Sequence, residues 1–165
     1  MESNNLVDIP EYEGIYKFDL VLNQVYSYHK NRYLKNYLLS NGYYQVSLTK
    51  NKIHTKFTIH KLVYKSNNPT EDLTGYDIDH IDCDKNNNKI ENLRKCSRSD
   101  NMSNKTTYIT NKLGVKYIVK TKYGYRFQLY KKGKYYSKYF KNLQEAIEYR
   151  NIKVKEINGE FANLG

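Results

Sequence analysis

The apolar residues of this chain come in short runs, and most runs are closed by an Asn or Gly turn signal. Residues 14–28 are rich in aromatic and β-branched side chains and break near Asn23, as two strands joined by a turn would. Residues 43–49 alternate after a turn at Gly42, and residues 54–60 form another such run. Only 39% of the chain is hydrophobic, so we predict small antiparallel sheets with modest cores.

The middle of the chain has a more specific local pattern. A short helix is expected over residues 60–68, ending ahead of Pro69. Residues 76–82 (YDIDHID) and 92–96 (NLRKC) are short enough for strands, and an Asn-rich loop separates them. Ser97 is followed three positions later by an acidic residue, which is a helix-start signature. The predicted order is strand, loop, strand, helix.

The last third reads as one further small unit. Residues 115–121, 125–131 and 134–140 form three strand-like runs separated by glycines. Residues 142–157 place apolar side chains at helical spacing behind Asn142, a plausible cap. The whole pattern predicts an α+β protein: a small β module, a central strand-loop-strand-helix segment, and a three-stranded antiparallel sheet packed on one helix.

The charge is distributed unevenly. The net charge is +11, with 9 Lys/Arg against 5 Asp/Glu in residues 1–68, 6 against 8 in residues 69–111, and 13 against 4 in residues 112–165. A mildly acidic centre between two basic flanks is expected if the centre binds a cation and the flanks bind phosphate. Charge alone leaves a solvated lysine-rich surface an equally good interpretation.

The centre carries side chains suited to phosphodiester hydrolysis. Asp79 and His80 are adjacent in a strand and therefore point to opposite sides. Hydrolysis needs a base to activate water and a cation to offset charge on the phosphate. A neutral imidazole such as that of His80 can be the base, and the oxygens of Asp79 and Asn101 are ligands that a hard cation prefers.

The stretch DHIDCDKNNNKIENLR, followed by SRSDN, resembles the HNH motif of the ββα-metal nucleases, especially the homing nucleases of phage introns. The resemblance implies that Asp79 and Asn101 bind metal, that His80 is the general base, and that Asn92 is a catalytic-site residue that holds the loop. The final His of the motif is Asn here, so Mg²⁺ or Mn²⁺ is the implied cofactor.

Both flanks resemble modules that accompany such nucleases. IPEYEGIYKF and TIHKLVY resemble a NUMOD-type segment, and the part from GVKYIVK to GEFANL resembles the Apetala or ethylene-response-factor type of DNA-binding domain. The implied modules are residues 1–57, 58–106 and 112–165.

Several basic residues are candidates for contact with DNA. We expect Arg94 either to contact phosphate or to pair with a nearby acid. Strand alternation adds five candidate DNA contacts, which are Lys116, Lys120, Arg126, Lys134 and Lys138. Lysine gives a point charge, so gripping phosphate is favoured over reading bases.

We therefore expect a metal-dependent endonuclease that acts as a monomer on double-stranded DNA and nicks one strand, as mobile-element homing enzymes do. The N-terminus lacks the pattern of a signal peptide and no apolar stretch is long enough to span a membrane, so a soluble intracellular protein is expected.

Two other functions remain as alternatives to the nuclease. One is a DNA-binding regulator with an inactive nuclease remnant, and the other is a basic RNA-binding protein. His60 is interpreted as structural or phosphate-contacting rather than as a second base.

Overall fold

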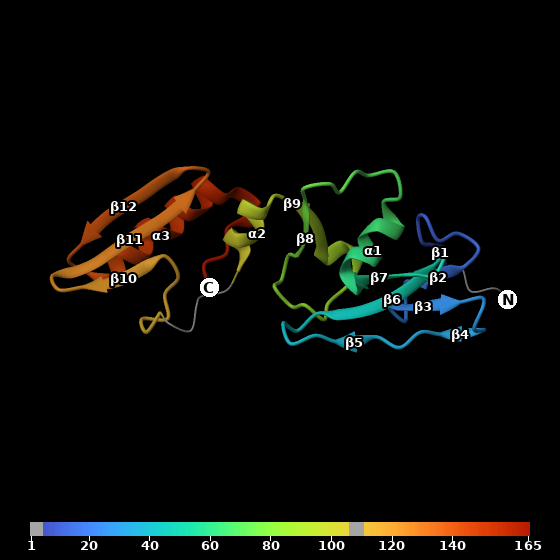
Figure 1. Cartoon of the computed structure of the whole chain (residues 1–165). Helices are drawn as coiled ribbons and strands as arrows, with labels where there is room; N and C mark the ends of the chain where they lie inside the picture. The colour runs from blue at the N-terminus through green and yellow to red at the C-terminus, as the bar shows by residue number, and fades with distance from the viewer. Residues whose placement is uncertain (1–4, 106–110) are drawn as a thin grey trace. The chain divides into compact units, whose positions relative to one another are not determined.

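The computed structural model describes residues 5–105 and 111–165, which fall into two compact units, residues 1–95 and residues 96–165 (Figure 1). We call these the N-terminal unit and the C-terminal unit. The described part is a mixture of antiparallel sheets and a few helices, which confirms the predicted α+β class. No helix within these described residues is long and apolar enough to cross a membrane.

The N-terminal unit consists mainly of short antiparallel strands. A four-stranded sheet contains β1 (Leu6–Asp8), β2 (Tyr16–Asp19), β3 (Gln24–Ser27) and β4 (Arg32–Tyr33). A three-stranded sheet contains β5 (Tyr37–Leu38), β6 (Tyr44–Lys50) and β7 (Ile53–Thr58). The chain reverses at Asn23 and Gly42 with φ of 53° and 84°, as the predicted turns at these positions require.

One helix and a third, two-stranded sheet complete this unit. The helix α1 (Ile59–Asn67) follows β7 directly, and the two-stranded sheet contains β8 (Asp77–His80) and β9 (Leu93–Cys96), with the 3-10 turn η1 (Ile90–Asn92) before β9. Phe18 and Leu48 are fully buried, and α1 adds Leu62 to the same core. Ile78 also belongs to this core, so β8 is fixed against the body of the unit.

The C-terminal unit is a three-stranded sheet with helices. Its elements are α2 (Arg98–Asn104), β10 (Ile118–Thr121), β11 (Gly124–Lys131), β12 (Lys134–Phe140), α3 (Leu143–Asn158) and η2 (Gly159–Phe161). Lys132 and Gly133 both have positive φ, as a two-residue hairpin turn demands. The side chain of Asn142 accepts a hydrogen bond from the Gln144 N–H at 2.7 Å, as its predicted cap role requires.

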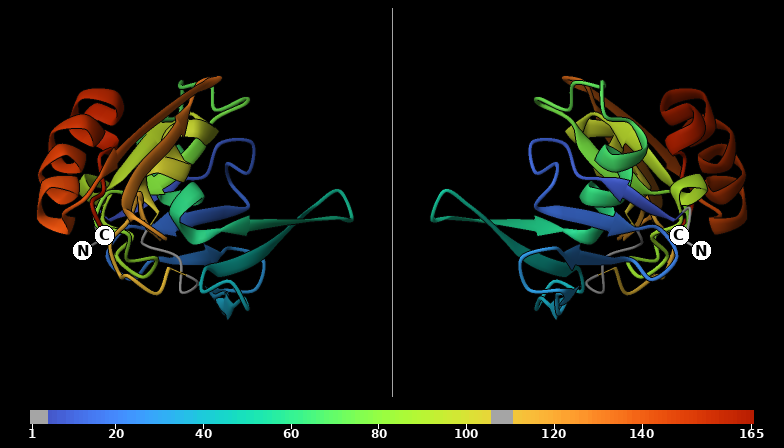
Figure 2. Two further views of the ribbon diagram at one scale, coloured as in Figure 1. Left: turned by 90° about the vertical axis from the view of Figure 1, so that its left-hand side faces the viewer. Right: turned by 90° about the vertical axis from the view of Figure 1, so that its right-hand side faces the viewer.

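The core of this unit lies between the sheet and α3. Phe127 and Leu129 of β11 pack against Val154 of α3, and Figure 2 shows the helix lying along one face of the strands. The predicted sheet-on-helix arrangement is therefore present, and the face of the sheet opposite α3 carries mainly polar and aromatic side chains.

Candidate active site

Asn92 closes the loop between β8 and β9. Its Nδ2 donates to Asp82 Oδ1 at 2.9 Å and to the Asn87 carbonyl at 2.8 Å, and its Oδ1 accepts from the Asp82 N–H at 3.1 Å. One amide thus ties both sides of the loop to the start of β9. These bonds match the loop-holding function expected of Asn92, and its importance for catalysis stays a prediction.

Asp82 is the acceptor at the centre of this loop. Burial raises the pKa of its carboxyl, but hydrogen bonds from the Asn87 and Asn92 amides and from the Asp84 N–H outweigh burial and lower the pKa below the ordinary value. The side chain is therefore ionised near neutral pH and keeps accepting these bonds. The Asn residues of this loop do more than allow the chain to turn, because their side chains and carbonyls also form the hydrogen bonds that hold the loop.

His80 is buried, with 3% of its surface exposed, and its ring orientation is fixed. Its Nε2 lies 3.0 Å from Oδ1 of Asn88, which is itself buried. An amide oxygen only accepts, so Nε2 is the donor of this bond, and in a neutral ring the lone pair is then on Nδ1. In this tautomer, Nδ1 is the ring nitrogen of His80 that can accept a proton. In the sequence Asn88 is only one residue of the Asn-rich loop, and nothing there indicates this contact.

Three rings pack together behind the loop. The centroids of Tyr43 and His60 are 4.8 Å apart, those of His60 and His80 are 5.1 Å apart, and those of Tyr43 and His80 are 5.9 Å apart. Burial is the main cause that lowers the pKa of His60 from 6.5 to about 3, and electrostatic interactions with His80 and Lys61 lower the pKa further. His60 is therefore a neutral packing partner of His80, which agrees with the structural interpretation of this residue.

This depressed pKa gives folding a pH dependence. The unfolded chain binds a proton on His60 below pH 6.5, whereas the folded chain does so only near pH 3. Stability from this residue is thus complete above pH 6.5, and between that value and about pH 3 each unit of acidification removes about 1.4 kcal/mol. We predict that His60→Phe, which keeps the ring packing, flattens the unfolding free energy between pH 5 and pH 7 in urea titrations. Parallel curves for the variant and the parent would contradict this.

Asp79 and Arg94 form an ion pair. The Arg94 Nη2 and Nε lie 3.1 Å and 3.2 Å from the same carboxylate oxygen, Asp79 Oδ2. Both side chains are largely buried, with exposed fractions of 9% for Asp79 and 13% for Arg94. Of the two interpretations of Arg94, pairing with an acid is the one the structure displays. Asp79 and His80 contact different partners, as expected for neighbours in a strand.

The predicted second metal ligand lies on α2. The Ser97 hydroxyl accepts from the Asp100 N–H at 3.2 Å and donates to the Asp100 carboxylate at 2.6 Å, so the predicted capping residues start the helix that carries Asn101. Within residues 5–105 and 111–165, no three His, Cys, Asp or Glu side chains gather as a metal cluster. The predicted set needs only one carboxylate and one amide oxygen, donors that suit a hard cation, and the convergence of Asp79 and Asn101 stays a prediction.

The C-terminal basic residues do not share one face, contrary to the alternation we expected. Residues directly opposite in antiparallel strands point to the same side, and the pairs Lys120–Tyr125, Phe127–Lys138 and Lys131–Lys134 lie on the helix side with Phe127. This assigns Lys120, Lys134 and Lys138 to the α3 side, where the Lys138 ammonium lies 4.5 Å from the Tyr149 ring centroid.

Only Arg126, among the five candidates, projects from the opposite face of the sheet. It contacts Tyr139, to whose hydroxyl it donates a hydrogen bond at 3.2 Å. Lys116 precedes β10 and is buried, with its ammonium bonded to backbone carbonyls. The expectation of a shared face was wrong because a one-residue difference in register exchanges the faces of a strand, and the sequence did not fix the register. Contact of these residues with DNA stays a prediction.

Comparison with known proteins gives three matches. Residues 57–103 match the sequence model of the HNH endonuclease family. An uncharacterized HNH endonuclease of Acanthamoeba polyphaga mimivirus is 35% identical over 79 residues, which are 48% of this chain and 24% of the viral protein. A solved structure of the HNH homing endonuclease I-HmuI, described as showing DNA binding and cleavage, has a TM-score of 0.54 and 32% identity. That match covers 60% of this chain and 56% of the other.

Proposed function

We propose, from the premise that residues 57–103 form an HNH endonuclease domain, that this chain hydrolyses phosphodiester bonds of double-stranded DNA. The observation that carries the proposal is the fixed imidazole of His80 in the matched segment. His80 follows Asp79 at the end of β8, and its Nε2 lies 3.0 Å from Oδ1 of Asn88, which belongs to the loop held by Asn92. The similarity to I-HmuI, whose structure is described by DNA binding and cleavage, supports the same chemistry.

In this mechanism His80 is the general base. The hydrogen bond to Asn88 keeps the proton on Nε2, so Nδ1 takes the proton from the attacking water. Packing against His60, which is neutral near pH 7, limits rotation of the ring. A buried, oriented base needs no reorganisation at the moment of reaction, which favours catalysis.

Asp79 and Asn101 would hold the cofactor, Mg²⁺ or Mn²⁺, through one carboxylate and one amide oxygen. When bound, such an ion offsets the negative charge that develops on the phosphate and on the departing 3′ oxygen. Arg94 holds the Asp79 carboxylate in one orientation through two hydrogen bonds. The side chain is therefore positioned before any ion arrives.

The two flanks would hold the duplex on either side of this site. We propose that residues 1–57 and 112–165 are NUMOD-like and ethylene-response-factor-like DNA-binding modules around an HNH module of residues 58–106. Residues 20–68 contain eight Lys/Arg and no acid, which suits contact with phosphates. One active site on a monomer cuts one strand, so the expected product is a nick.

A supercoiled-plasmid assay tests the proposal. With Mg²⁺ the chain should convert supercoiled circles to relaxed circles, and EDTA should stop the reaction. Linear DNA as the first product would contradict nicking. A chain that shifts duplex DNA in a gel without Mg²⁺ and never relaxes the plasmid would be the alternative, an inactive DNA-binding regulator, and preference for structured RNA in competition would indicate the RNA-binding class.

A further inference from the structure

The helix α2 is held by side chains that come from later parts of the chain. It has seven residues, fewer than the roughly 12 to 15 that an isolated helix needs to be even marginally stable in water. The last four carbonyls of any helix also lack partners within it. Stability of α2 therefore depends on what the C-terminal unit supplies at these carbonyls.

Lys131 of β11 makes the most deeply buried contacts to α2, at groups other than these last four carbonyls. Its side chain is 4% exposed, and its ammonium lies 2.7 Å from Asp100 Oδ1, 2.7 Å from Ser103 Oγ and 3.2 Å from the Ser99 carbonyl. An ammonium has three donors, and here three α2 residues accept them. A lysine from the sheet is thus bonded into the helix at a carboxylate, a hydroxyl and a backbone oxygen.

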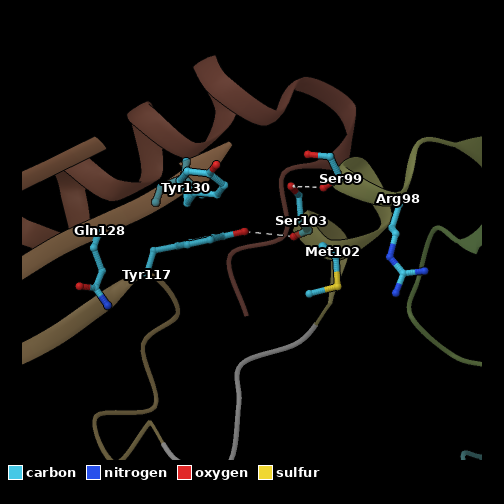
Figure 3. A pocket seen from close by; sticks show the side chains of 8 residues that line it. Arg98, Ser99, Met102, Ser103, Tyr117, Gln128 and Tyr130 are labelled. Atoms are coloured by element: carbon cyan, nitrogen blue, oxygen red, sulfur yellow. Dashed lines mark hydrogen bonds between the residues drawn. The ribbon is translucent and has the colours of Figure 1, made fainter. Parts of the chain in front are cut away.

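A second group of donors covers the C-terminal end of α2. The Lys116 ammonium donates to the Ser103 carbonyl at 2.7 Å and to the Lys105 carbonyl, and the Tyr117 hydroxyl donates to Ser103 at 3.1 Å, as Figure 3 shows for the tyrosine. Asn163, near the end of the chain, donates to the Asn104 carbonyl at 2.6 Å. Cations at this end also interact favourably with the negative end of the helix dipole.

We propose that Lys131 and Lys116 are positioning residues that hold α2, and with it Asn101, in the conformation needed to bind the divalent ion. This inference rests on the proposed function. Asn101 lies directly after Asp100, which Lys131 contacts, and within one turn of Ser103, which both lysines contact. The C-terminal module therefore has a task besides contact with DNA, because it completes the helix that carries a metal ligand.

The consequence concerns metal affinity more than DNA affinity. Both ammonium groups are buried, so neither is displayed to a phosphate backbone. Loss of the Lys131 contacts lets α2 open, which places Asn101 correctly in only a fraction of molecules. Residues that orient a metal ligand typically change metal affinity roughly 10- to 100-fold when replaced.

The first test measures the Mg²⁺ concentration that gives half-maximal plasmid nicking. For the full-length Lys131→Met variant this concentration should rise roughly 10- to 100-fold. The matched control is Lys132→Met, which removes the exposed neighbouring ammonium and should leave the midpoint unchanged. Irreversible loss of folded protein would lower the amplitude without moving the midpoint, and circular dichroism at the assay temperature detects reversible unfolding, which would move it. An unmoved midpoint in folded Lys131→Met would overturn the inference.

The second test does not need cleavage. Amide hydrogen exchange of the metal-free full-length proteins should be faster in α2 of Lys131→Met than in the parent, while amides of β6 remain equally protected. If Lys131→Met does not fold, Ser103→Ala, which removes one acceptor, should show the same change to a smaller extent. Unchanged α2 protection would refute the inference even if the parent is a nuclease, whereas a parent that never cuts would refute only the function.

Discussion

Replacing His80 with alanine should reduce the rate of plasmid nicking at saturating DNA and Mg²⁺ by roughly 100- to 10,000-fold, the usual contribution of a general base. His80 is buried against His60 and bonded to Asn88, so alanine removes the group that takes the proton from water. The affinity for uncleaved duplex should change little, because a general base acts on the attacking water and contributes in the transition state rather than to binding of the duplex.

The measurement pairs single-turnover nicking with a gel-shift affinity for the same plasmid fragment. His29→Ala is the matched control, since His29 is exposed at the surface and its removal should leave the nicking rate unchanged. Circular dichroism at the assay temperature confirms that His80→Ala is folded. Nicking by His80→Ala at the parent's rate would remove the general base from the mechanism.

Replacing Arg94 with methionine should lower the free energy of unfolding by about 3 kcal/mol at pH 7. The substitution leaves the Asp79 carboxylate buried without its guanidinium partner, and the partial exposure of Arg94 puts the expected loss at the lower end for buried pairs. For a chain of this size the unfolding midpoint should fall by roughly 6 to 12 °C.

The double variant Arg94→Met/Asp79→Asn separates charge from packing. Because it removes both charges, most of the lost stability should return, whereas a pure packing defect would persist. Thermal unfolding of the parent, both single variants and the double variant gives the coupling energy between the two residues. A coupling energy near zero would show that the ion pair does not hold the Asp79 carboxylate.

Features encoded by adjacent residues could be predicted from the sequence. The turns at Asn23 and Gly42 and the helix caps at Ser97 and Asn142 each depend on a backbone or hydrogen-bonding preference of one or two residues. The hairpins and the sheet-on-helix order of the C-terminal unit followed from these signals. The two-residue strands β4 and β5 were missed because they are too short to show an alternating pattern.

Features that depend on distant contacts could not be predicted. Lys116 was expected to contact DNA, yet Lys116 and Lys131 are both buried because α2 and the residue after it provide carbonyl, hydroxyl and carboxylate acceptors for them. The contact of Tyr43 with His60 and His80 joins segments far apart in sequence, and no local pattern marks it. Around the candidate site, the sequence indicated the proposed reacting groups and missed the side chains that contact and orient them.

In the proposed mechanism, Asp79 and Asn101 hold one divalent ion beside His80. Manganese binding, followed by electron paramagnetic resonance of the free ion, tests it in the parent, Asp79→Ala, Asn101→Ala and the double variant. Either single substitution should weaken binding markedly, and the double variant should bind hardly more weakly than the worse single variant, since both lose the same ion. Parent-like Mn²⁺ binding by Asn101→Ala, or losses that simply add, would contradict a shared site.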